Sequence, residues 1–421
     1  MFATLKQIFT PKNKDLQKRI LFTLGALFIF KLGIAISVPG MKQYLGLNSL
    51  GFLELVNAMG GGAMEQYSIF SLGVMPYITA SIIIQLLQMD IVPYFADLAK
   101  EGHSGRVKLN TITRYVGIAL AFIQGYMFAL AFGKGTVNVA TYMEFAIVLT
   151  AGTAFLLWLG DQITAKGFGN GLSMIIMAGI IASLPSMFMN AWNVFVDNAT
   201  TMSMVIGSLK FLVFVIVYFA IIIGVVYEQL TERRINVQYA NRSASVLGKQ
   251  NYIPFKLNSA GVVPVIFASS LISILSLIAK FIGNAGFESF VNNWLAMTTP
   301  TGLVVYVGLI ILFAYFYTFL QVKPKELAEN LQQNGGYIPA VRPGNETIEY
   351  IYGVLNRITI VGALALAVLA GMPIVFGLIT NLPSSVTIGG TGLLIVVGVA
   401  LESYKQIESR LVSRSYTRGR K

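Results

Sequence analysis

Long apolar runs recur along the whole chain and constrain its fold more than any other feature. A helix needs about 20 mostly apolar residues to cross the hydrocarbon core of a bilayer. Hydrophobic residues make up 55% of the 421 residues and charged residues only 11%, whereas a soluble domain carries about 25% charged residues. We therefore expect an all-α polytopic membrane protein with ten transmembrane helices, at 20–38, 69–89, 112–132, 145–159, 172–189, 209–227, 262–282, 303–320, 358–376 and 388–401.

The 30 basic residues are distributed unevenly between the loops that separate these segments. Cytoplasmic loops of membrane proteins carry the excess of Lys and Arg. With the N-terminus in the cytoplasm, Lys31 lies within the first span and the outer loops hold only four basic residues, Lys42, Lys134, Lys210 and Lys280. All the others fall on the inner side. This bias places both termini in the cytoplasm, which requires an even number of spans and agrees with ten.

Six stretches are predicted to face the cytoplasm, and four of them are an N-terminal segment at 1–19, loops at 228–258 and 321–357, and a basic tail at 403–421. The two loops are unusually long, polar and basic, and both contain turn residues. We interpret them as docking surfaces, although part of their charge serves as a topology signal.

The segment 52–67, FLELVNAMGGGAMEQY, lies on the outer side and is too short to span. It is half apolar and is interrupted by Gly60, Gly61 and Gly62. One interpretation is an ordinary loop or a re-entrant surface helix. The other is a movable segment in a cavity between helices, since irregular backbone at membrane depth is tolerated only where protein or water surrounds it.

The side chains that carry enzymatic chemistry are scarce. The chain has no cysteine and a single histidine, so thiolate and His-pair metal sites are excluded. The glycines of KGFGNG at 166–171 follow no predicted strand, so a dinucleotide site is not expected. None of the 18 acidic residues falls at the centre of a predicted span, where coupled carriers usually place a carboxylate. We expect no enzyme, cofactor or metal site; a secondary transporter for a small solute remains the alternative to a passive pore.

Seven motifs, in chain order, resemble landmarks of the SecY family, whose members are central subunits of the protein-conducting Sec translocon. They are SLGVMPYITASIIIQLLQMD (71–90), KEGHSGRVKLNTITRY (100–115), GFGNGLSMIIMAGI (167–180), RRINVQYANR (233–242), KLNSAGVVPVIFASS (256–270), GGYIPAVRPGNET (335–347) and GGTGLLIVV (389–397). The resemblance implies two inverted five-helix halves, 20–190 and 207–402, around an hourglass pore. It also implies a side gate between the second and seventh spans.

The resemblance further implies a ring of apolar residues at the pore waist, formed by Val74, Ile78, Leu172, Ile176, Ile266 and Ile395. The first two pairs are each spaced four residues apart, so each pair shares one helix face. An apolar constriction blocks ions by dewetting. Each of these residues, considered alone, would be interpreted as packed or lipid-facing.

A plug for the outer funnel is implied at 52–67, with Val56, Asn57, Gly60, Gly61 and Gly62 as its central residues. The polar residues expected at the side gate are Thr79, Gln85 and Asn258. Hydrogen bonds between such groups in a bilayer are worth about 1 kcal/mol, which suits a gate that closes reversibly.

The implied partners follow the family: SecE and SecG in a heterotrimer, the SecA ATPase, the ribosome, membrane lipids, and secretory or nascent membrane-protein chains. The docking residues would be Arg233, Arg234, Arg242, Lys249 and Arg342. Lys and Arg would pair with rRNA phosphates in a salt-sensitive way. The implied function is conduction of unfolded secretory proteins across the bacterial plasma membrane and sideways release of transmembrane segments, driven by a partner.

Overall fold

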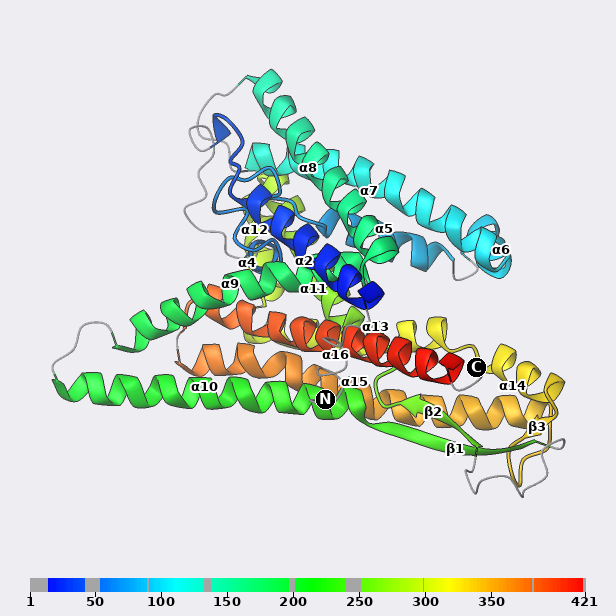
Figure 1. Ribbon diagram of the computed structural model, residues 1–421. Coiled ribbons are helices and arrows are strands. Elements are labelled where there is room, and N and C mark those ends of the chain that lie inside the picture. The colour runs from blue at the N-terminus through cyan, green and yellow to red at the C-terminus, as the bar shows by residue number, and fades with distance from the viewer. Residues whose placement is uncertain are drawn as a thin grey trace.

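The computed structural model describes residues 14–41, 54–88, 91–131, 138–196, 201–239, 251–297, 299–380 and 382–418. Within these ranges a helix covers each of the ten predicted apolar segments (Figure 1). They are α2 (Lys14–Ile34), α5 (Met75–Leu87), α7 (His103–Ala131), α8 (Val139–Lys166), α9 (Gly171–Val196), α10 (Thr201–Leu230), α11 (Val263–Ile282), α13 (Pro300–Gln321), α15 (Asn345–Thr380) and α16 (Ser384–Arg418).

Seven helices in the described ranges are long and apolar enough to cross a membrane: α7, α8, α9, α10, α11, α13 and α15. Large apolar side chains such as Leu209 and Ile223 of α10 are exposed on the surface. A soluble monomer rarely exposes apolar surface on this scale. The prediction of an all-α polytopic membrane protein is confirmed, and the helices are consistent with ten spans.

The second apolar segment is helical over a shorter range than predicted. The prediction of a helix from Ile69 was wrong, because residues 69–74 form turns and α5 begins at Met75. Gly73 has a φ of 55°, a left-handed conformation that interrupts a helix. Pro76 then occupies the first turn of α5, where its missing N–H costs no hydrogen bond.

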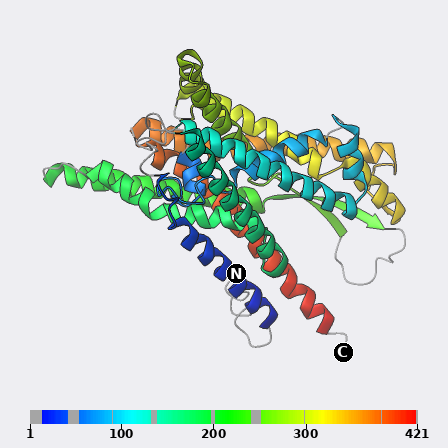
Figure 2. The ribbon, with the colours of Figure 1, turned by 90° about the horizontal axis from the view of Figure 1, so that it is seen from above.

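Four short helices lie outside the spans. Helix α4 (Glu54–Met59) falls in the 52–67 segment, for which a surface helix was one interpretation, whereas α6 (Pro93–Lys100), α12 (Ala285–Trp294) and α14 (Pro324–Gln333) were not predicted. Several spanning helices also extend beyond their apolar segments. In particular, α15 begins at Asn345 and α16 continues to Arg418. Figure 2 shows that the start of α2 and the end of α16 project on the same side of the molecule.

The two halves of the chain meet along two seams. On one seam α9 packs against α16, and on the other α5 and α7 pack against α11. Most of the buried apolar side chains form one cluster that runs through both halves. Phe70 of this cluster stacks on Phe30 of α2, which also belongs to it, and on the more exposed Phe155 of α8.

The two predicted cytoplasmic loops fold together into a small unit, which we call the sheet subdomain. Strands β1 (Glu232–Tyr239), β2 (Asn251–Lys256) and β3 (Gly336–Tyr337) form an antiparallel sheet in the order β2-β1-β3. Register pairs Glu232 with Lys256 and Tyr239 with Gly336. A separate apolar cluster joins the sheet to α14 and the first turns of α15, through Ile235, Val237, Phe255, Ala328, Leu331, Ile338, Ile351 and Leu355.

Glycines allow close approach at several helix contacts, and Gly362 of α15 illustrates the constraint. A Cβ at Gly362 would overlap the carbonyl oxygen of Leu257, whereas a Cβ at Gly353 of the same helix would meet no atom within 4 Å. The segment that leads into α11 therefore rests directly on the α15 backbone.

We predict that Gly362→Ala destabilises the protein by about 1–3 kcal/mol through overpacking. The matched variant Gly353→Ala should be neutral or slightly stabilising, since Ala is the better helix former. The midpoint of thermal unfolding in detergent micelles checks both, and equal midpoints for the two variants would contradict the packing argument.

Candidate pore and gate

The six predicted ring residues come from four structural elements. Val74 directly precedes α5 and Ile78 lies in its first turn, with the Ile78 N–H donating to the Val74 carbonyl oxygen at 3.1 Å. Leu172 and Ile176 lie one turn apart at the start of α9. The other two members come from the second half, Ile266 in α11 and Ile395 in α16.

The structure brings these side chains into the same apolar cluster. Val74, Ile78, Ile176, Ile266 and Ile395 are buried members of it, and Leu172 is partly exposed and packs against it. Residues separated by up to several hundred positions in sequence thus belong to one apolar cluster, which contains residues of both halves.

The segment predicted as a plug is described from Glu54 onward. It consists of α4 and a series of turns, and the Asn57 side chain organises these turns. The Asn57 Oδ1 accepts hydrogen bonds from the backbone N–H groups of Met64 at 3.1 Å and Glu65 at 3.3 Å. The Asn57 carbonyl oxygen accepts from Gly62 N–H at 2.8 Å. Gly61 and Gly62 have φ values of 71° and 83°, so two glycines of the triplet are required for the turn.

This folded segment lies against both halves. Helix α4 packs against α9 and α16, and Val56, Met59 and Met64 belong to the cluster that contains the ring residues. A Cβ at Gly61 would come within 3.2 Å of the Gly179 Cα of α9, and a Cβ at Gly179 would overlap the Met59 carbonyl oxygen. Two glycines thus permit backbone-to-backbone contact between the segment and α9.

The end of the segment is bound to the end of α2. Val38 N–H donates to the Tyr67 carbonyl oxygen at 2.7 Å, and Ile69 N–H donates to the Ile36 carbonyl oxygen at 3.1 Å. The Ser68 hydroxyl donates to the Gly33 carbonyl oxygen at 2.9 Å. The Tyr67 end is therefore attached to α2, while the α4 end rests on α9 and α16.

The polar residues predicted for the side gate do not bond across it. Thr79 donates to the Met75 carbonyl oxygen of its own helix at 3.1 Å. Gln85 donates to the Ser81 hydroxyl of the same helix at 3.0 Å. The contact between α5 and α11 is mainly apolar, and it includes the Ser270 hydroxyl 3.8 Å from the Met75 sulfur.

Asn258 anchors the segment that leads into α11. Its Nδ2 donates to the Glu228 Oε1 of α10 at 3.0 Å and to the Gly261 carbonyl oxygen at 2.9 Å. Glu228 is only 3% exposed, and its second oxygen has no hydrogen-bond partner. The sequence placed residue 228 at the start of the predicted loop 228–258 and did not reveal this buried pair; the position of Glu228 directly after an apolar run was the available signal.

The predicted docking residues that the structure describes are exposed on the sheet subdomain. Arg233 and Arg234 lie near the start of β1, and Arg234 pairs with Glu232 at 2.8 Å and stacks over the Tyr252 ring at 4.7 Å. Arg342 follows β3, with its side chain 88% exposed and its guanidinium 3.9 Å from the Glu346 carboxylate. Arg242 and Lys249 lie outside the described residues.

Arg233 and Arg234 lie near the start of β1, where it pairs with β2. Strand β3, which ends five residues before Arg342, pairs with the other end of β1 at Gln238 and Tyr239. In the described part of the chain, no three acidic or histidine side chains come together as a metal site.

The fold and its apolar helices define a multi-pass helical membrane protein. A family model described as SecY matches residues 68–404. "Protein translocase subunit SecY" of Halalkalibacterium halodurans is 46% identical over 431 residues, covering 99% of both chains. The Bacillus subtilis protein of the same name is 44% identical over 429 residues, with the same coverage. The chain therefore belongs to the SecY family.

Solved structures share the fold. One described as "The structure of a protein conducting channel" aligns with a TM-score of 0.69 and 18% identity, covering 94% of this chain and 93% of that one. Sec61 in the canine ribosome-channel complex from the endoplasmic reticulum aligns with a TM-score of 0.68, 18% identity and the same coverage.

We predict that Asn258→Leu weakens the attachment of α11 to α10, because it leaves the buried Glu228 carboxyl without its donor, at a cost of about 1–3 kcal/mol. The double variant Asn258→Leu/Glu228→Leu should recover much of the loss, since both polar partners are then removed. Thermal unfolding in micelles measures this, and a double variant less stable than the single would contradict it.

Proposed function

We propose that the chain is the central pore-forming subunit of a Sec translocon. It conducts unfolded secretory proteins across the bacterial plasma membrane, and it releases transmembrane segments sideways into lipid. The observation that carries this proposal is the convergence of the six ring residues, from both halves, on one apolar cluster. The full-length similarity to proteins named translocase subunit SecY supports the same assignment.

The ring would act as a seal without sequence preference. Apolar side chains offer no hydrogen bonds to water or ions, so a narrow ring of them excludes both by dewetting. The same side chains bind no particular sequence of a passing polypeptide. Val74 and Ile78 in the first half would meet Ile266 and Ile395 of the second half, so separation of the halves would widen the ring.

The 52–67 segment would close the outer funnel at rest. Its turns, held by Asn57, pack against the cluster that contains the ring. Its Tyr67 end is bonded to α2, so this end would act as the attachment when the α4 end moves away from α9 and α16.

The side gate would open between α5 and α11. These helices meet through apolar contacts and one sulfur–hydroxyl contact, which can separate without leaving charged groups unpaired. Thr79 Oγ1 and Gln85 Nε2 already donate within α5, so these two bonds would persist when the gate opens. Asn258 would serve as the fixed anchor at the start of α11.

The halves of the pore would be 20–190 and 207–402, with both termini in the cytoplasm. The two seams, α9 with α16 and α5/α7 with α11, support this division. The sheet subdomain would then face the cytoplasm and receive SecA or the ribosome, the source of the driving force. SecE and SecG would complete the heterotrimer, and the basic tail would contact anionic lipids.

The function is tested with the full chain and its copurified partners in proteoliposomes. A stalled secretory chain should crosslink to a photoreactive residue at Ile78 or Ile266, and not to one at the surface residue Ile223 of α10, which is 67% exposed.

Deleting residues 56–64 should raise the resting ion conductance of a planar bilayer. Crosslinking at Ile223 alone would contradict the pore assignment, and unchanged conductance would contradict the plug.

The docking role of the sheet subdomain is tested separately. Arg342→Glu should abolish motor-driven export while the protein still inserts and folds, because the exposed guanidinium would be replaced by a repulsive charge. Lys325→Glu, in the exposed first turn of α14, makes the same charge change nearby and should retain most export. Normal export by the Arg342 variant in vesicles with SecA and ATP would refute the assignment.

A further inference from the structure

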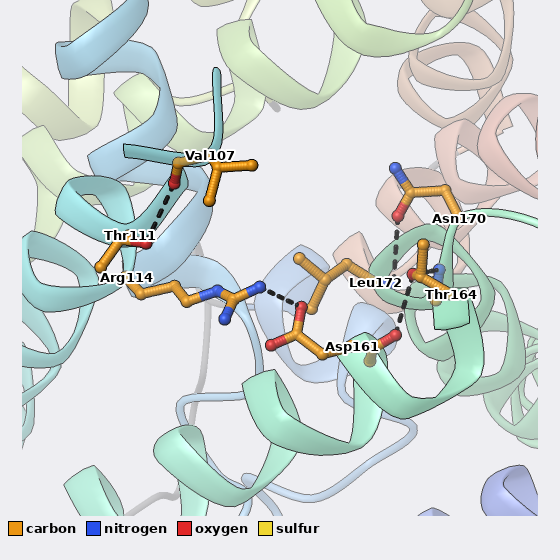
Figure 3. Close-up of polar contacts among 9 residues, drawn as sticks. Val107, Thr111, Arg114, Asp161, Thr164, Asn170 and Leu172 are labelled. Carbon is orange, nitrogen blue, oxygen red and sulfur yellow. Dashed lines mark hydrogen bonds and ion pairs between the residues drawn. The ribbon is translucent and has the colours of Figure 1, made fainter. Parts of the chain in front are cut away.

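An ion pair inside the first half is not used by any of these roles. The Arg114 Nη2 of α7 lies 2.7 Å from the Asp161 Oδ1 of α8 (Figure 3). Both side chains are only partly exposed. Arg114 lies at the start of the predicted span 112–132, and Asp161 lies just beyond the end of the predicted span 145–159, so the pair joins α7 and α8 at one end of their apolar segments. We call this contact the α7–α8 ion pair.

On one side, the α7–α8 ion pair adjoins the gate helix α5. Less than one turn beyond Arg114, a Cβ at Gly117 would lie 3.3 Å from the Tyr77 Cα of α5. Tyr77 directly precedes the ring residue Ile78 in α5. The ion pair is therefore at the level where α5 enters the apolar ring. Helix α7 also packs against α11, on the opposite side of the gate.

On the other side, the ion pair adjoins the ring residue Leu172. Asp161 follows Gly160, and a Cβ at Gly160 would lie 2.8 Å from the Leu172 Cδ2. Figure 3 shows Asp161 on α8 between Arg114 and the first turn of α9, which carries Leu172. No side chain separates the α8 backbone from Leu172 at this point.

The turn between α8 and α9 is held firmly enough to transmit a displacement. The Thr164 hydroxyl oxygen accepts from Gly171 N–H at 2.8 Å. The Asn170 Oδ1 accepts from Leu172 N–H at 3.2 Å and Ser173 N–H at 3.4 Å. A Cβ at Gly171 would overlap the Gly160 carbonyl oxygen. The start of α9 therefore follows α8 closely.

We propose that Arg114 and Asp161 are positioning residues, which hold Leu172 in the resting ring and couple its position to the gate helices. The proposal rests on the assignment of Leu172 to a pore ring. The ion pair makes α7 and α8 move as one unit. A displacement of α7 when α5 and α11 separate is then passed through Gly160 and the α8–α9 turn to Leu172.

A charged pair suits this role better than an apolar contact. A pair that is partly exposed adds little stability, and a buried one can often be replaced by apolar residues without loss. Its distinguishing property is geometric specificity, because a charge-assisted hydrogen bond fixes distance and direction. An apolar contact between α7 and α8 would permit sliding.

The chain has no cysteine, so Leu172→Cys provides a single thiol in the full chain with its copurified partners. We expect its labelling rate by a water-soluble maleimide, in resting proteoliposomes, to rise about threefold in Arg114→Gln or Asp161→Asn, the size expected for a partly exposed pair. The double variant should show no further rise. The swap Arg114→Asp/Asp161→Arg should return the rate towards that of the parent.

Lys108→Gln is the matched control. Lys108 lies near the start of α7, the helix that carries Arg114, and its substitution also removes one positive charge and one ion pair, that with Glu101. The labelling rate of Leu172→Cys should be the same with and without Lys108→Gln. Arg114→Gln and Asp161→Asn should also increase export of a precursor with a defective signal sequence. A loss of stability alone would not increase this export. Additive effects, or labelling unchanged in both single variants, would overturn the proposal. If the single variants fail to accumulate, the swap Arg114→Asp/Asp161→Arg tests the proposal instead. Fast labelling of Leu172→Cys in a folded swap variant would overturn the proposal.

Failure of the proposed function is distinguishable from failure of this inference. Ile176→Asn polarises the ring without touching the α7–α8 ion pair, and it should raise resting ion conductance. If it does so while labelling at Leu172 is insensitive to Arg114 and Asp161, the pore stands and the coupling is refuted. If neither Ile176→Asn nor the deletion of residues 56–64 raises conductance, the pore assignment itself fails.

Discussion

A bilayer interior offers no hydrogen-bond partners, and this constraint shapes the rest of the structure. Backbone groups at depth must be paired within the chain, so spans are helical and irregular backbone occurs only where protein surrounds it. The 54–74 stretch satisfies this condition. Its N–H groups are paired with carbonyl oxygens of its own turns, with Asn57 and with the end of α2. The segment can therefore lie against α9 and α16 without being a transmembrane helix.

Close backbone contact is the second means by which the helices are held. Lipid tails are as apolar as side chains, so burial alone does not drive helix association, and small residues at interfaces allow closer packing. Gly179 permits the plug segment to contact α9, Gly362 permits the α11 entry to contact α15, and Gly171 permits α9 to contact α8. Each of these glycines lies where one functional part of the proposed channel meets its support.

In the proposed channel, polar contacts would anchor the ends of the moving parts, and the contacts that separate would be apolar. Asn258 and Glu228 fix the start of α11, and Ser68 fixes the end of the plug segment to α2. The contacts that would have to separate, between α5 and α11 and around the ring, consist mainly of apolar side chains. Such contacts can open and close without leaving a desolvated charge, whose cost would be large.

The sequence alone determined the positions of the helices, because membrane thickness sets the length of each apolar run and such runs are visible without an alignment. The order of the motifs then predicted the ring residues and the plug. Tertiary structure alone decided which polar groups pair, because the partners are distant in sequence: Asn258 and Glu228 are 30 residues apart, and Arg114 and Asp161 are 47 apart. It also decided that α5 begins only at Met75 and that two loops join in one sheet, since Gly73 adopts a positive φ and β3 pairs with β1. The apolar pattern of a segment indicates whether it lies in lipid, protein or water, whereas the residues it contacts depend on how the helices pack.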